Sequence, residues 1–203
     1  MLDSRLTVGS GGNLSIVDRG TGRVFITPSG LDYRSMTLED IVVCSLDGCL
    51  EPGQRKPSSE LGIHLALYSG RAEIGAVVHT HSVYATTIAC LGLEIPAVHY
   101  LVGFAGAKVP LAPYATFGTP ALAEAVLDSI GDFKAILLAN HGMIAVGPSL
   151  GTAFAVAEEI EFVARIYYQT LLAGEPKILS SLQMQEVLAK FETYGQPGPE
   201  EGR

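Results

Sequence analysis

Basic residues, cysteines and long apolar runs are all scarce in this sequence of 203 residues, which also has no tryptophan. Lysine and arginine total 13 against 21 acidic residues, which gives a formal net charge of -8. Nucleic acids and anionic membrane surfaces bind clusters of basic side chains, and a chain this acidic does not favour either partner. The apolar runs are also much shorter than the roughly 18 to 20 residues that cross a bilayer. We therefore expect no nucleic-acid partner and no membrane span.

The few cysteines and the N-terminal residues bear on cellular location. Cys44, Cys49 and Cys90 have neither CxxC spacing nor the density of a disulfide-stabilised fold, so we expect reduced thiols. The first residues lack a basic region followed by an apolar core and a cleavage site, so they do not indicate a signal peptide. These features together predict a cytoplasmic protein.

Short strand-like and helix-like patterns alternate along the chain, and 48% of the residues are hydrophobic. This is enough apolar material for one substantial core, so we expect a single domain over residues 1–195 and a disordered tail over residues 196–203. The alternation predicts an α/β fold built around one central sheet. The expected strands are residues 14–17, 24–26, 41–45 and 74–81, the first three forming a small sheet. The expected helices are residues 60–69, 82–91, 120–130, 150–173 and 181–191.

Residues 135–146 form another apolar run, interrupted by the polar point at Asn140, His141 and Gly142. This pattern predicts a strand that either turns or continues at that point.

Two histidines follow a buried apolar run with a spacing that suits a metal site. In a strand, His79 and His81 point to the same face, so both imidazoles can reach one ion. His141 lies at the polar break of another buried run, where a sheet could bring it beside them. Three neutral imidazoles favour zinc and leave a fourth coordination position open for a substrate. The spacing alone is equally compatible with two strand-end histidines that bind no metal.

Glu60 follows a Lys-Pro-Ser-Ser segment at the predicted start of a helix. Unpaired backbone N–H groups and the helix dipole make such a position suitable for an anion, and Ser58 or Ser59 is a candidate N-cap and phosphate-binding residue. An ordinary helix cap with an acidic first turn explains the same residues. His64 lies on the apolar stripe of this predicted helix and is interpreted as a core histidine.

Several segments in order resemble the signature of class II aldolases of the L-fuculose-phosphate type, within the class II aldolase and adducin-head family. They are GGNLS, ITPSG, KPSSE, VVHTHS, IPAVHY, APYATFGT, NHG and KFETYG, and they extend from Gly11 to Gly195. The resemblance implies a three-layer α/β/α fold around a mainly antiparallel sheet. It also implies a homotetramer with active sites at subunit interfaces.

The resemblance assigns a role to each matching residue. His79, His81 and His141 match ligands of one Zn²⁺ per chain, and Glu60 matches a catalytic acid/base that can also contact the metal. Tyr100 and Tyr194 match catalytic residues. The positions that match substrate and phosphate contacts are Gly12, Asn13, Ser29, Gly30, Ser58, Ser59 and Phe117.

These assignments predict a lyase that cleaves L-fuculose 1-phosphate, or a related deoxyketose 1-phosphate, to dihydroxyacetone phosphate and an aldehyde such as L-lactaldehyde. Cleavage leaves an enediolate whose charge a Lewis acid can stabilise, and Glu60 can carry the proton. Tyr100 is the candidate proton carrier at the aldehyde oxygen, with His99 beside it.

The same scaffold leaves other functions open. These are methylthioribulose-1-phosphate dehydratase, ribulose-phosphate 4-epimerase, for which Asp is usual in place of Glu60, and an adducin-like binding module, which lacks the metal histidines. Two features depart from the family pattern. Only about a dozen residues precede the GGNLS segment, where a helix is usual, and Asn140 replaces a frequent second histidine before His141.

Overall fold

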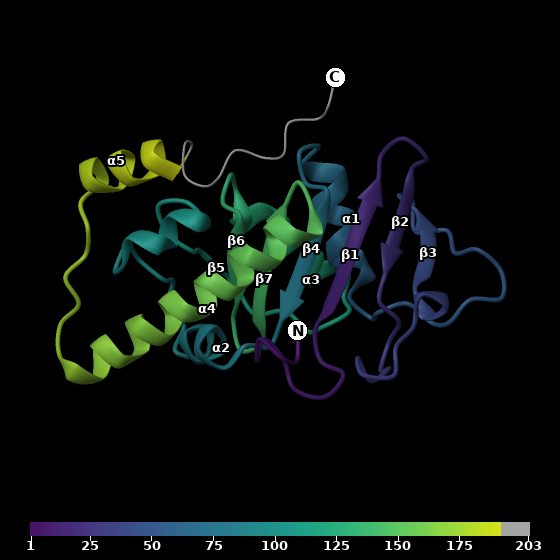
Figure 1. Ribbon diagram of the computed structural model, residues 1–203, viewed down its shortest axis with the longest axis horizontal. Helices are drawn as coiled ribbons and strands as arrows, with labels where there is room; N and C mark the ends of the chain where they lie inside the picture. Colours follow the sequence, from purple (N-terminus) through teal and green to yellow (C-terminus); the bar gives the residue numbers. More distant parts are fainter. Residues whose placement is uncertain (192–203) are drawn as a thin grey trace, which may run out of the picture.

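One seven-stranded sheet forms the centre of the computed structural model, which describes residues 1–191 (Figure 1). Its strands follow the order β3-β2-β1-β4-β7-β6-β5. Every neighbouring pair is antiparallel except β5 and β6, which are parallel, so the prediction of a mainly antiparallel sheet is confirmed. The strands are β1 Asn13–Asp18, β2 Arg23–Ile26, β3 Val42–Ser45, β4 Ala76–Thr80, β5 Leu111–Ala112, β6 Ala135–Leu138 and β7 Gly142–Gly147.

Helices cover both faces of this sheet. The α-helices within the described residues are α1 Leu61–Gly70, α2 Val83–Cys90, α3 Pro120–Ile130, α4 Leu150–Ala173 and α5 Ser181–Phe191, and two short 3₁₀ helices are η1 Leu38–Asp40 and η2 Tyr100–Phe104. In Figure 1, α4 crosses in front of the sheet, whereas α1 and α3 lie behind it. No helix of the described residues is long and apolar enough to span a membrane.

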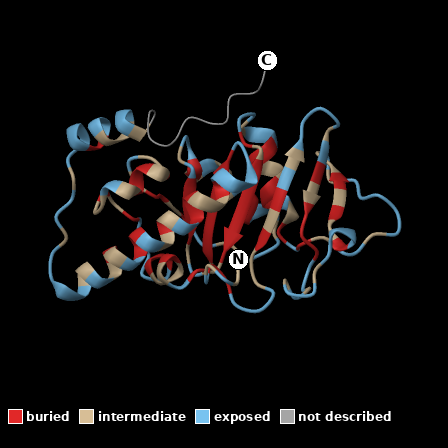
Figure 2. Ribbon diagram, in the orientation of Figure 1, coloured by how far each residue is buried: buried red, intermediate tan, exposed pale blue. Residues whose placement is uncertain are grey.

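Strand β4 shows why two separate cores form. Successive side chains of a strand point to opposite faces. Ala76 and Val78 therefore join the core that contains α2 and α4, whereas Val77 joins the core that contains α1 and α3. Buried residues fill the central strands between these layers, as the red segments of Figure 2 show. This arrangement confirms the three-layer prediction and places His79, two residues after Val77, on the α1 side.

Two predictions about the elements need correction, and the alternative left open at residues 140–142 is decided. The first three strands do not form a small sheet of their own, because β1 pairs with β4 along Leu14↔Val78 and its neighbours. The N-cap of α1 is Glu60 rather than Ser58 or Ser59, and the Ser58 hydroxyl instead accepts a hydrogen bond from the Glu60 N–H at 3.2 Å. The polar break at His141 is a turn, since β6 and β7 are antiparallel neighbours.

Glu161 on α4 contacts the start of α2. Its carboxylate oxygens each accept a backbone N–H at 2.9 Å, one from Tyr84 and one from Ala85. These two residues begin α2, whose first N–H groups have no partner within the helix. Glu161 therefore fixes the start of α2 against α4.

Candidate active site

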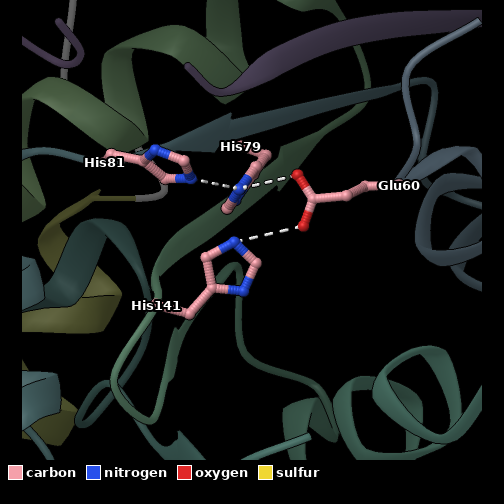
Figure 3. A group of neighbouring side chains, drawn as sticks. All are labelled: Glu60, His79, His81 and His141. Carbon is pink, nitrogen blue, oxygen red and sulfur yellow. Dashed lines mark hydrogen bonds and ion pairs between the residues drawn. The ribbon is translucent and has the colours of Figure 1, made fainter. Parts of the chain in front are cut away.

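Four metal-ligating side chains meet at one end of the central strands. One ligand atom from each of Glu60, His79, His81 and His141 lies within 4.8 Å of all the others (Figure 3). His79 is the penultimate residue of β4, His81 directly follows that strand, and Glu60 is the N-cap of α1. His141 comes from the turn between β6 and β7.

The pairing of β4 with β7 explains how a distant histidine reaches the first two. These strands are antiparallel, and Thr80 near the end of β4 lies opposite Met143 near the start of β7. The residue that precedes β7 is thereby brought beside the residues that follow β4. Asn140 in this turn has φ 56°, a left-handed conformation that asparagine tolerates better than most residues.

Gly142 lets the two strands approach closely at this point. A Cβ atom at this position would lie 2.3 Å from the Thr80 carbonyl oxygen and 3.0 Å from Cδ2 of His81. Both distances are shorter than ordinary van der Waals contacts. A larger residue would therefore push β7 and the His141 turn away from the other two histidines.

The hydrogen bond of His79 determines which of its nitrogens faces the cluster. Nδ1 lies 3.0 Å from the backbone oxygen of Met143, and because a carbonyl only accepts, Nδ1 carries the proton. In the neutral ring, Nε2 then presents a lone pair toward the cluster. A second-layer carbonyl that orients a histidine in this way is usual at metal sites.

The separations within the cluster fit a bound cation. Nε2 of His79 lies 3.0 Å from Nε2 of His81 and 3.1 Å from Oε2 of Glu60, and Nε2 of His141 lies 3.2 Å from Oε1. Two ligands about 2.1 Å from one tetrahedral ion stand about 3.4 Å apart, which is close to these values. A lone pair facing a carboxylate oxygen is repulsive unless a proton or a cation lies between them. The cluster therefore fits a divalent metal ion.

Burial and mutual contacts set the protonation of the cluster. Burial raises the pKa of Glu60, but the contacts from His141 and then His79 outweigh it and hold that pKa below its usual range. Burial, followed by the neighbouring His79 and His141, lowers the pKa of His81 to about 4. Near pH 7 the cluster thus combines an ionised carboxylate with a neutral His81 ring, which is the ring form that binds metals.

A cavity of about 400 Å³ opens beside the cluster. It is lined by Glu60, His81 and His141 together with every position that the resemblance matched to substrate or phosphate contacts. These positions are Gly12, Asn13, Ser29, Gly30, Ser58, Ser59 and Phe117. The structure therefore brings the predicted binding residues together, and their roles toward a substrate remain predictions.

Two loops at the rim of the cavity hold each other in place through their main chains. The Ser29 N–H donates to the Lys56 oxygen at 3.0 Å, and the Ser58 N–H donates to the Thr27 oxygen at 3.2 Å. These two N–H groups already have partners, so the hydroxyls of Ser29 and Ser58 are the better candidates for contacts with an anion. Gly12 has φ 71°, and a Cβ there would lie 2.5 Å from the His79 oxygen, so only glycine fits.

Tyr100, one of the two predicted catalytic tyrosines, lies away from the cavity. Tyr100 does not line the cavity, and its ring packs instead on His99 at 4.8 Å between centroids and on Phe191 at 6.4 Å. About half of Tyr100 (51%) is exposed. Tyr194, like the whole tail of residues 196–203, lies outside the described residues.

Some residues of the site received no role from sequence reasoning. Tyr114 and Asn140 line the cavity, although Tyr114 belongs to the APYATFGT segment that supplied only Phe117 as a prediction. The side chain of Asn13 donates to Glu60 Oε2 at 2.9 Å, a contact that the phosphate assignment did not anticipate. His64 is fully buried and hydrogen-bonded, so its interpretation as a core histidine is confirmed. Burial lowers its pKa to about 3.

Known proteins resemble this chain over nearly its whole length. It is 55% identical over 196 residues to a 5-deoxy-D-ribulose 1-phosphate aldolase of Bacillus thuringiensis, covering 97% of this chain and 92% of that protein. It is 44% identical to a 5-methylthioribulose-1-phosphate/5-deoxyribulose-1-phosphate aldolase of Rhodospirillum rubrum, over 94% and 85% of the two chains. An L-fuculose phosphate aldolase of Escherichia coli is 41% identical, over 94% and 88%.

A solved structure and a family model agree with these relatives. A crystal structure of an L-fuculose 1-phosphate aldolase superposes with a TM-score of 0.92 at 42% identity, covering 94% of this chain and 90% of the other. The family model described as the class II aldolase and adducin N-terminal domain matches residues 1–168. This chain therefore belongs to the class II aldolase and adducin N-terminal domain family.

Proposed function

We propose that this chain is a zinc-dependent aldolase that cleaves a deoxyketose 1-phosphate to dihydroxyacetone phosphate and a short aldehyde. The observation that carries this proposal is the meeting of one ionised carboxylate, Glu60, with three imidazoles at the wall of a cavity rimmed by hydroxyls. A binding module has no use for a buried, ionised carboxylate at such a position, whereas proton transfer next to a carbonyl requires one.

The substrate that we favour is 5-deoxyribulose 1-phosphate, with acetaldehyde as the second product. The family resemblance by itself favours L-fuculose 1-phosphate as the substrate. This chain is 55% identical to a protein named for the 5-deoxyribulose compound and 41% identical to one named for the fuculose compound. This difference supports 5-deoxyribulose 1-phosphate as the preferred substrate. Both substrates give dihydroxyacetone phosphate and differ only in the aldehyde.

Zinc is the proposed ion because three imidazoles and a carboxylate are ligands that it favours. His79, His81 and His141 would hold it, with Glu60 close enough to contribute an oxygen when no substrate is present. When bound, the ion supplies Lewis-acid stabilisation of the negative charge on the substrate's oxygens.

The protein's own groups would move two protons, which are followed most simply in the direction of condensation. The Glu60 carboxylate takes a proton from C3 of dihydroxyacetone phosphate and leaves an enediolate. C3 then forms a bond to the aldehyde carbon, and the former aldehyde oxygen takes a proton from a phenol, for which Tyr100 is our candidate. After condensation Glu60 carries one extra proton and the phenol lacks one, and exchange with solvent restores both groups. Cleavage reverses each transfer.

The phosphate would be bound by hydroxyls and main-chain groups of the two paired loops. Ser29, Ser58 and Ser59 line the same cavity as Gly12 and Gly30. Neutral donors of this kind can bind a phosphate without a basic side chain, as at glycine-rich loops. This arrangement suits a chain with a net charge of -8.

The proposed assembly is a homotetramer in which one subunit supplies Tyr100 and Tyr194 to the cavity of another. Support comes from Tyr100, which is half exposed and does not line the cavity of its own chain. A residue with a catalytic role in that position can act only at a neighbouring subunit's site or after a large movement.

A panel of aldehydes tests the proposed reaction. Purified protein would be given dihydroxyacetone phosphate with acetaldehyde or with L-lactaldehyde, and separately methylthioribulose 1-phosphate. We expect condensation with both aldehydes, a higher kcat/KM with acetaldehyde, and loss of activity after treatment with a chelator. Water loss from methylthioribulose 1-phosphate without condensation would indicate a dehydratase instead, and no turnover of any compound would contradict the proposal.

A further inference from the structure

A row of buried polar side chains leads from Glu60 into the protein interior. Asn13 Nδ2 lies 2.9 Å from Glu60 Oε2, and Asn13 Oδ1 lies 2.5 Å from His64 Nε2. The Ser15 hydroxyl oxygen is 2.6 Å from His64 Nδ1 and 2.6 Å from the Tyr68 hydroxyl oxygen. None of the five residues is more than 6% exposed.

Two regular elements build this row. Glu60, His64 and Tyr68 are four residues apart and share one face of α1. Asn13 and Ser15 are two residues apart and share the face of β1 that meets this helix. The row is therefore a continuous line of contacts between a helix and a strand, and none of the three residues beyond Asn13 and Glu60 lines the cavity.

The chemistry of the groups fixes the direction of every hydrogen bond. The ionised Glu60 only accepts, so the Asn13 amide nitrogen must face it and the Asn13 oxygen must face His64. His64 Nε2 then carries a proton and donates to that oxygen. In the neutral ring, Nδ1 is left as an acceptor for the Ser15 hydroxyl, and Ser15 in turn accepts from Tyr68.

This direction makes the two oxygens of Glu60 different from each other. Oε2 receives the Asn13 amide and faces His79, whereas Oε1 is buried without a hydrogen-bond partner. Oε1 lies 3.2 Å from His141 Nε2. The Asn13 amide therefore holds Oε2, and Oε1 is the oxygen on the His141 side of the cluster.

On the basis of the function proposed above, we propose that His64 is a positioning residue that orients the Asn13 amide against Oε2 and thereby holds the Glu60 carboxylate in place for proton exchange with the substrate. His64 does not touch the cavity and acts only through Asn13. An amide does not pass protons along a hydrogen-bond chain, so the row orients the carboxylate and does not conduct protons away from it.

Two substitutions of His64 separate positioning from packing. In His64→Gln, the side-chain amide can occupy the place of Nε2 and still donate to Asn13, but it loses the contact with Ser15. In His64→Asn, the amide can occupy the place of Nδ1 and keep the contact with Ser15, but it loses the donor to Asn13. Each variant therefore removes one hydrogen bond from the row, and the two are matched in that respect.

The readouts are the bound metal per chain, the Tm, and the exchange of the C3 proton of dihydroxyacetone phosphate with solvent. We expect both variants to keep their metal and to lose Tm to a similar extent. Proton exchange should fall about 10- to 100-fold in His64→Asn, as for residues that orient a ligand from outside, and much less in His64→Gln. KM should change less than kcat, and the pH profile should keep its midpoint.

Equal exchange rates in the two variants, after correction for metal content, would overturn the positioning role. Ile136→Val is a suitable control, because Ile136 is fully buried in the core on the α1 side and its apolar side chain takes no part in the hydrogen-bond row. It should lower Tm without changing exchange. Absence of exchange in the unsubstituted enzyme would instead contradict the proposed function, so the two failures are distinguishable.

A measurement on the unsubstituted protein tests the row without any variant. Nitrogen NMR of histidine labelled with ¹⁵N reports which ring nitrogen carries the proton. We expect His64 to be neutral with the proton on Nε2. A proton on Nδ1 would reverse the direction of the row and overturn the inference even if both variants failed to fold.

Discussion

Glu60 is the residue on which the chemistry of this site depends. It is 6% exposed and surrounded by three imidazoles, yet the contacts from His141 and His79 keep it ionised. A buried carboxylate next to a Lewis acid can take a proton from carbon only if it is not itself fully neutralised by a donor. Asn13 donates to Oε2 and leaves Oε1 free of that amide.

At this scale, Glu60→Gln separates metal binding from proton transfer. The three imidazoles remain, so we expect the variant to keep its metal, whereas the amide cannot accept the C3 proton. Exchange of that proton on dihydroxyacetone phosphate should fall at least 10²-fold, the lower end of what a general base contributes. Elemental analysis and NMR-detected exchange are the two measurements. Exchange at the rate of the unsubstituted enzyme would remove Glu60 from this role.

Sequence reasoning predicted some residues of the site for physical reasons and others only by resemblance. The period of a strand put His79 and His81 on one face, and the structure places both in the cluster. The polar break made His141 a candidate third ligand, and the family resemblance supported it, but sequence separation does not reveal that β7 pairs with β4. The contact of Asn13 with Glu60 depends on a tertiary packing of β1 against α1 that no local pattern reports.

At the scale of elements, the hairpin of β6 and β7 depends on Gly142. In Gly142→Ala, the added methyl would meet the Thr80 carbonyl at 2.3 Å and His81 at 3.0 Å. We expect a lower Tm and a loss of about tenfold or more in zinc affinity, because the histidines can no longer converge as closely. Competition with a chromophoric chelator measures that affinity.

A second glycine provides the control for this substitution. An added Cβ at Gly151 in the first turn of α4 meets no atom within 4 Å, and alanine favours a helix. Gly151→Ala should keep full zinc affinity and an equal or slightly higher Tm. Equal zinc affinity in Gly142→Ala and Gly151→Ala would show that close packing at Gly142 does not organise the site.

The regular helices were predictable because the helical spacing of apolar residues and the residues that begin or end helices indicate the same bounds. The expected bounds of residues 120–130, 150–173 and 181–191 match α3, α4 and α5. Thr119 caps α3 through the Leu122 N–H. Strand β5 was missed because it is a two-residue parallel pair between prolines, too short to leave a periodic signal. The membership of the first three strands in the central sheet was missed because hydrogen bonding between β1 and β4 is long-range.

At the scale of the whole molecule, the proposed tetramer predicts that active sites are shared between subunits. Glu60→Gln and Tyr100→Phe should each lower activity strongly when made alone. When the two variants are mixed in one oligomer, about one quarter of the sites should combine an intact Glu60 with an intact Tyr100, if assembly is random. Coexpression of differently tagged variants and a rate measurement on the mixed oligomer provide the test. Activity no higher than that of the parents would exclude a shared site.

The central claim is that His79, His81 and His141 hold one zinc ion beside Glu60. The most direct measurement is elemental analysis of the protein purified without chelator. The account predicts about one zinc per chain in the unsubstituted protein. Protein that is folded and free of bound metal would contradict it.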